Sequence, residues 1–167
     1  TSDGSNKTAT CTITVNPILA NSVTLNQTSS SLYPNETLQL TATVLPSNAT
    51  NKSVTWKSSN TAIATVDNNG KVTAKATGNC TITVTTADGS NKSATCAITV
   101  NPVLATSVTL NQTSASLYPD GTVQLTATVL PTNTTNKSVT WSSSNTGVAT
   151  VDSNGKVTGK GVGDCTI

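Results

Sequence analysis

The sequence contains no histidine, arginine, phenylalanine or methionine. Histidine is the commonest metal ligand and general base, and arginine is the usual bidentate phosphate contact. Nine scattered lysines give a net charge of only +2, and two Trp with two Tyr are too few for a base-stacking platform. No apolar run reaches the length of a membrane-spanning helix. We therefore expect no nucleic-acid partner and no membrane span in this segment.

Groupings of residues that carry catalysis are also missing. The sequence has no Ser/His/Asp set, no paired carboxylates and no Gly-rich phosphate loop. The stretches "DNNGK" (67–71) and "DSNGK" (152–156) cluster oxygens as calcium loops do, but they lack the later bidentate Glu. We interpret both as turns, and we predict no enzyme activity, no cofactor and no metal site.

Threonine is the most prominent residue and fills 36 of the 167 positions. Thr and the abundant Val are β-branched, so they lose side-chain freedom in a helix and fit a pleated sheet. No stretch carries apolar residues at helical spacing over three turns. The composition therefore predicts an all-β fold.

An internal repeat organises the chain. Residues 16–82 align without a gap to residues 101–167, with 51 identities in 67 positions at a shift of 85. The opening stretch "TSDGSNKTATCTITV" (1–15) matches "TADGSNKSATCAITV" (86–100) at 12 of 15 positions. A period of about 85 residues is too long for a solenoid repeat and suits a small β-sandwich.

Within one repeat, short alternating segments are separated by turn signals, as in a two-sheet sandwich. Trp56 and Trp141 share the parity of Val54 and Val139, which predicts that both tryptophans lie in the core. "DNNG" and "ADGSN" are typical hairpin turns. The strands that we predict are 22–26, 30–33, 37–45, 52–58, 61–67, 70–76, 80–86 and 94–100.

The string "VTWKSSNTAIATVDNNGKVTAKATGNCTITV" (54–84), with its copy from Val139 onward, resembles the bacterial immunoglobulin-like domain of group 2. The family pattern is a Trp, a short Ser/Asn segment, "ATVD", a Gly-led hairpin, then Gly and "TITV". The resemblance implies tandem immunoglobulin-like β-sandwiches of about 85 residues each. It also implies a bacterial surface protein of the intimin and invasin type, or a phage structural protein.

The four cysteines are not part of that family pattern. Cys80 and Cys96 lie eight residues either side of Asp88, so a hairpin centred there places them directly opposite each other on the inward face. Opposed residues bring Cβ atoms to about 4.5–5.5 Å, near the range of a disulfide. We therefore predict a Cys80–Cys96 disulfide within the repeat and, with it, an oxidising extracellular environment; the alternative is a pair of buried free thiols. By the same repeat, Cys11 and Cys165 are expected to bond across the boundary between neighbouring units.

The shift of 85 also divides the chain into three parts. Residues 1–15 are interpreted as the last strand of a preceding repeat, residues 16–101 as a complete repeat and residues 102–167 as a repeat lacking its last strand. Two accounts are open: the chain is a window of a longer repetitive polypeptide, or separate subunits donate residues 1–15 to one another as a strand. Both predict that residues 1–15 of one unit pair with 164–167 of the next, head to tail.

These observations predict a non-catalytic structural segment of an extracellular bacterial stalk or fibre. Near-identical copies lengthen an object without adding chemistry, and the "VNP" joints (15–17 and 100–102) form short, stiff linkers. The partners that we expect are neighbouring copies of the same repeat. The alternatives are an adhesive module that binds a host receptor or glycan, and a phage virion domain.

Overall fold

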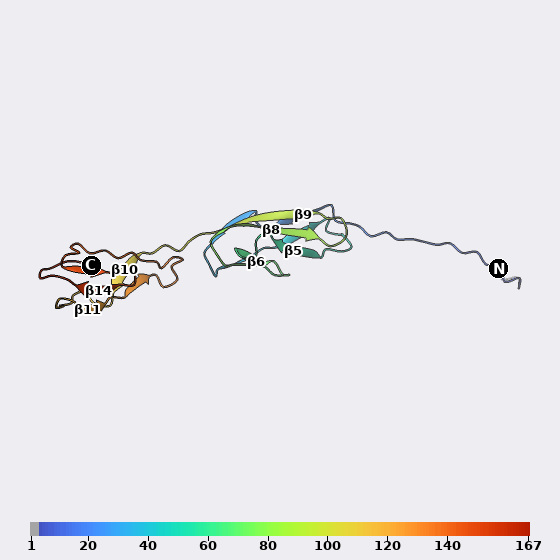
Figure 1. Cartoon of the computed structure of the whole chain (residues 1–167). Helices are drawn as coiled ribbons and strands as arrows, with labels where there is room; N and C mark the ends of the chain where they lie inside the picture. The colour runs from blue at the N-terminus through green and yellow to red at the C-terminus, as the bar shows by residue number, and fades with distance from the viewer. Residues whose placement is uncertain (1–3) are drawn as a thin grey trace. The chain divides into compact units, whose positions relative to one another are not determined.

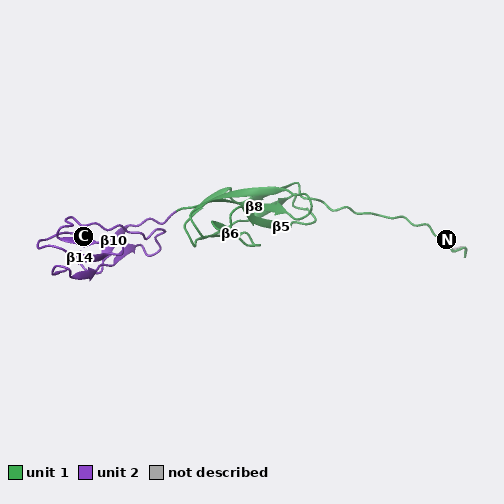
Figure 2. Cartoon of the chain, in the orientation of Figure 1, with its two compact units in different colours: residues 1–101 green, residues 102–167 purple. Residues whose placement is uncertain are grey.

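The computed structural model describes residues 4–167, so the first three residues of the opening stretch lie outside the described residues. The chain divides into two compact units, residues 1–101 and residues 102–167 (Figure 2). The division falls between Asn101 and Pro102, within the second "VNP" joint.

Unit 1 is built from strands, as the Thr/Val composition predicts, and no helix occurs among the described residues (Figure 1). The prediction of an all-β fold is therefore confirmed. Its strands are β1 (Ser22–Leu25), β2 (Ser29–Leu32), β3 (Thr37–Gln39), β4 (Ala42–Leu45), β5 (Val54–Ser58), β6 (Ala64–Val66), β7 (Lys71–Ala74), β8 (Gly78–Thr86) and β9 (Ser93–Val100).

Two sheets of unit 1 enclose its main core. The first has the order β2-β9-β8-β5 and the second the order β3-β7-β6, while β1 and β4 form a separate antiparallel pair. Strand β2 runs parallel to β9, and the other pairs are antiparallel. The buried residues of β8 alternate mostly with half-buried ones and those of β9 with more exposed ones, and they meet Leu40, Val72 and Ala74 from the other side. This arrangement is a β-sandwich with β9 at the centre of one layer.

The segment 37–45, predicted as one strand, is divided between two sheets. β3 pairs with β7, β4 pairs with β1, and the break falls at Leu40 and Thr41. The side chain of Asn26 holds the break, because its carbonyl oxygen accepts from the Thr41 amide at 2.9 Å and its amide nitrogen donates to the Gln39 carbonyl at 3.3 Å. Sheet switching of this kind leaves the inward–outward alternation intact, so the residue pattern did not reveal it.

Unit 2 repeats part of this arrangement. β10 pairs with β12 as β1 pairs with β4, and the sheet β11-β14-β13 matches β3-β7-β6. Within residues 102–167, the counterparts of β2, β5 and β8 are not in strands, and the shift of 85 places the counterpart of β9 at positions beyond 167. The strands are β10 (Ser107–Leu110), β11 (Thr122–Gln124), β12 (Ala127–Leu130), β13 (Ala149–Val151) and β14 (Lys156–Gly159).

Candidate interaction site

The cysteine pair of unit 1 is not in the predicted register. Cys80 lies opposite Ile98, and Cys96 lies opposite Ile82. The β8–β9 loop is centred on Gly89 rather than Asp88, because Thr85 pairs with Ser93 and positive φ angles fall at Gly89 (+88°) and Asn91 (+54°). This displacement of one residue in the turn moves the pairing by two residues.

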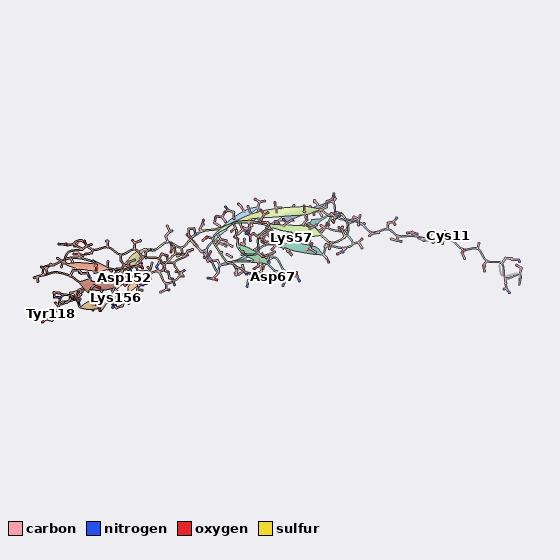
Figure 3. The ribbon with its side chains drawn as sticks, in the orientation of Figure 1. Cys11, Lys57, Asp67, Tyr118, Asp152 and Lys156 are labelled. Carbon is pink, nitrogen blue, oxygen red and sulfur yellow. The ribbon has the colours of Figure 1, made fainter. Side chains whose placement is uncertain are left out.

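The predicted disulfide is therefore wrong for this register. Cys80 and Cys96 are diagonal neighbours, a relation that places Cα atoms about 7–8 Å apart, whereas the Cα atoms of a disulfide lie about 4.4–6.8 Å apart. Both are buried free thiols, and burial, with a smaller contribution from the nearby Cys80, raises the pKa of the Cys96 thiol. Cys11 is exposed on the segment that precedes the sheets, and Cys165 is half-buried; both are free as well (Figure 3).

Each tryptophan packs against the core of its unit but is half-buried rather than fully enclosed. Trp56 lies opposite Val84 on β8 and contacts both core clusters of unit 1, and Trp141 packs against the core of unit 2. A turn glycine lies directly against each ring. A Cβ atom added at Gly70 would lie 2.7 Å from Cζ2 of Trp56, and one at Gly155 would lie 2.8 Å from Cζ2 of Trp141.

The same glycines close the "DNNG" and "DSNG" turns, as predicted. In both turns the carboxylate accepts from two backbone amides: Asp67 from Asn69 and Lys71, and Asp152 from Asn154 and Lys156. Figure 3 labels both aspartates. These oxygens hold the turn, and among residues 4–167 no group of three or more potential metal-ligating side chains occurs.

Asp88 forms a contact that the sequence reasoning missed. Its Oδ2 accepts from the Ala20 amide at 2.5 Å, and its Oδ1 accepts from the Ser90 amide at 3.0 Å and the Ser90 hydroxyl at 2.5 Å. These bonds, that from Ala20 above all, hold the pKa of Asp88 far below its usual range. The contact fastens the β8–β9 loop to the segment that leads into β1, where Ala20 is buried. Only the turn signal "DGSN" pointed to Asp88 in the sequence, and it did not reveal the distant partner.

Both units dock their leading segment in the same way. Ile18 donates to the Thr50 hydroxyl and accepts from the Thr50 amide, both at 2.9 Å. Val103 does the same with Thr135, at 2.8 and 2.9 Å. The short linkers are therefore fastened to the body that follows them by hydrogen bonds to a threonine.

Unit 2 carries a groove of about 300 Å³ that lies entirely within the unit. Apolar side chains that include Leu110, Leu117 and Val157 line it, and its rim includes Tyr118 and residues 163–167. Leu117 is 37% exposed, whereas its counterpart Leu32 in unit 1 is 7% exposed on β2, the strand paired with β9. The groove thus corresponds to the position that β9 occupies in unit 1.

Comparisons with known proteins agree with this fold. The family model described as "Bacterial Ig-like domain (group 2)" matches residues 20–98 and 104–167. The matched segments are two tandem domains of the immunoglobulin-like class. The chain belongs to the family of bacterial Ig-like domains of group 2, as its motifs predicted.

Similar proteins include an uncharacterized protein of Clostridium acetobutylicum, 44% identical over 84% of this chain and 14% of that protein. An Ig-like virion protein of Serratia phage KSP90 is 38% identical over 78% of this chain and 52% of that protein. The chain therefore spans a small part of the first relative and about half of the second. Among solved structures, an intimin mutant of EHEC O157:H7 aligns with a TM-score of 0.36 at 22% identity, over 55% of this chain and 48% of that one.

Proposed function

We propose that this chain is a non-catalytic structural segment of an extracellular bacterial surface protein, a spacer that holds another part of the polypeptide away from the cell. Its partners are neighbouring repeats joined head to tail. Membership of a family whose domains occur in surface and virion proteins supports this role.

The observation that carries the proposal is the repeated docking of the linker. A spacer transmits position only if its joints resist bending, and bonds from Thr50 to Ile18 and from Thr135 to Val103 fasten each linker to the following unit. Asp88 adds a further bond at Ala20. Ordering these few residues in every repeat reduces their conformational entropy. In a flexible tether the linker residues would remain disordered and keep that entropy.

Backbone order in residues 16–21 tests the proposal. We expect ¹⁵N relaxation to give order parameters of about 0.85, as in rigid strands. Thr50→Val, which removes the hydroxyl acceptor, should lower them, whereas Thr43→Val, at an exposed position of β4, should not. Values below about 0.6 in the unaltered chain would contradict a stiff spacer.

A virion domain is the second candidate, because a relative of which this chain covers about half is a phage virion protein. An adhesive module is the third, and it would require a ligand surface. A glycan and cell-binding array with the unaltered chain separates them: specific binding supports the adhesive module, whereas absence of binding leaves the two structural roles.

A further inference from the structure

We propose that Asn69 and Asn154 are latent modification sites, at which the fold suppresses spontaneous deamidation, and that Gln39 and Gln124 keep these sites closed. The inference goes beyond the spacer role, because it concerns a covalent reaction between a side chain and its own backbone. Three features of the molecule support it: the dipeptide at each turn, the hydrogen bonds that hold that dipeptide and the lack of space around its glycine.

An asparagine that precedes a glycine can react with the glycine's backbone nitrogen. This nitrogen attacks Cγ of the asparagine and forms a carbon–nitrogen bond, while the bond from Cγ to the side-chain nitrogen breaks. The proton of the attacking nitrogen passes to the leaving group, which departs as ammonia. Water then opens the resulting succinimide at either carbonyl and gives aspartate or isoaspartate. Glycine favours the attack because it has no Cβ atom to shield its nitrogen.

The sequence contains this dipeptide twice, at 69–70 and at 154–155. The first lies in the turn between β6 and β7, and the second lies in the turn between β13 and β14. Both asparagines are exposed to water, whereas both glycines are buried. Exposure therefore does not protect either side chain, and the conformation of the turn determines how fast it reacts.

The peptide group between Asn69 and Gly70 is hydrogen-bonded on both sides. The Asn69 carbonyl accepts from Nε2 of Gln39 at 2.7 Å. The Gly70 amide donates to the Asp67 carbonyl at 3.1 Å, and the Gly70 carbonyl accepts from the Leu40 amide at 3.0 Å. The attacking nitrogen is thus already engaged as a donor, and its peptide plane cannot rotate toward Cγ of Asn69 without breaking these bonds.

Unit 2 holds its own dipeptide with the same bonds. The Asn154 carbonyl accepts from Nε2 of Gln124 at 2.7 Å. The Gly155 amide donates to the Asp152 carbonyl at 3.1 Å, and the Gly155 carbonyl accepts from the Leu125 amide at 2.9 Å. The arrangement is therefore a property of the repeated turn and of the strand beside it.

Each glutamine joins the turn to a strand through one side-chain nitrogen. Nε2 of Gln39 also donates to the Leu40 carbonyl at 2.9 Å, and Nε2 of Gln124 donates to the Leu125 carbonyl at 2.8 Å. Both glutamines are exposed. Their side chains can therefore be changed without emptying the core, so their effect on the turn can be measured separately from folding.

The surroundings of Gly70 also oppose the movement that the reaction needs. A Cβ atom added at Gly70 would lie 2.5 Å from the Leu40 carbonyl oxygen and 2.7 Å from Cζ2 of Trp56. A deamidated turn would fit poorly here, because isoaspartate adds a methylene group to the backbone and either product adds a carboxylate near Asp67. Deamidation in a transiently opened turn would therefore leave permanent damage.

Peptide mapping by mass spectrometry of the full chain tests the proposal. Deamidation at Asn69 and Asn154 is followed at mildly alkaline pH in native buffer and in guanidinium chloride. The reaction rate follows the population of the open turn. Opening breaks the three bonds described above, each worth about a fivefold factor, so both sites should react about a hundredfold more slowly in the native chain. Equal rates in the native and unfolded chains would overturn the proposal.

Variants of the two glutamines test their role as positioning residues. Gln39→Leu removes the donor and should speed deamidation at Asn69 about fivefold, while Asn154 in the same chain is unchanged. Gln124→Leu should show the reverse. Gln39→Lys retains a donor of similar length and should keep the slow rate. Thr37→Val, on the same exposed side of β3, is the matched control and should leave both rates unchanged.

The unfolding midpoint of unit 1 in urea distinguishes a local effect from a loss of global stability. We expect Gln39→Leu to raise the rate at Asn69 by more than any change in global unfolding would produce. A rate that rises only in proportion to the lost stability, or that does not rise, would overturn the assigned role of Gln39. These readouts are independent of the linker relaxation that tests the spacer role, so either proposal can fail alone.

Discussion

Gly70→Ala should destabilise unit 1 far more than the same change at another turn glycine of that unit. Gly70 has φ +80°, and an added Cβ would lie 2.5 Å from the Leu40 carbonyl oxygen and 2.7 Å from Cζ2 of Trp56. Neither neighbour moves freely, because one is backbone and the other is a ring packed on the core. The change therefore combines backbone strain with a steric clash.

Gly89 supplies the matched control. Its φ is +88°, and an added Cβ would meet nothing within 4 Å. Ala at a positive φ costs about 1 kcal/mol, so Gly89→Ala should lower the free energy of unfolding by about that amount. The clash at Gly70 adds about 1–3 kcal/mol, as overpacking does, for a total of about 2–4 kcal/mol. In a unit of this size, each kcal/mol lowers the melting temperature by about 4–8 °C.

Hydrogen exchange in increasing urea measures the effect, because peptides from unit 1 report its unfolding separately from unit 2. We expect the peptides of unit 1 to lose protection at clearly lower urea in Gly70→Ala than in Gly89→Ala, while unit 2 is unchanged. If both variants lost protection at the same urea concentration, the Trp56 ring and the Leu40 carbonyl would be able to move aside with little loss of stability. That result would refute the packing argument.

Three further predictions concern the core, the Asp88 contact and the thiols. Trp56→Ala should cost about 3 kcal/mol in urea unfolding, at the low end for an aromatic core residue because the ring is half-buried; an unchanged midpoint would contradict its packing role. Since the folded-state pKa of Asp88 is lowered, its stabilisation is complete above the unfolded pKa of about 4 and is lost as the pH falls below it. Acid should therefore lower the protection factor of the Ala20 amide, which is its intrinsic exchange rate at that pH divided by its observed rate, and Asp88→Asn should abolish that pH dependence. Alkylation without reductant should label Cys11 quickly but Cys80 and Cys96 only after unfolding; two thiols that stay unlabelled in the unfolded chain would restore the disulfide.

Alternation along the chain was sufficient to place most strands of unit 1 and the sides of those strands that face the core, but it did not separate β3 from β4 within residues 37–45. It predicted the inward positions of β8 and β9 because side chains alternate whatever the partner strand is. Register was not predictable in the same way. The "ADGSN" turn fits a centre at either Asp88 or Gly89, and the choice depends on the bonds of Thr86 with Lys92 and of Asp88 with Ser90 and Ala20.

The Asp88 contact and the glycine beneath each tryptophan were also beyond local patterns. Asp88 and Ala20 are 68 residues apart, and nothing near either residue indicates the other. Gly70 was interpreted only as a turn residue, although the approach of the Trp56 ring also excludes a side chain there. Long-range contacts of this kind become visible when the sheets are placed, since the strands bring distant residues together.

The two units contain nearly the same sequence but differ in secondary structure, which shows how far strand formation depends on a neighbour. "VTW" occurs at 54–56 and at 139–141, but only the first copy lies in a strand, β5, which pairs with β8. β8 in turn pairs with β9 along eight residues. A strand with an unpaired edge leaves backbone groups unsatisfied, so the central strand stabilises those on both sides of it.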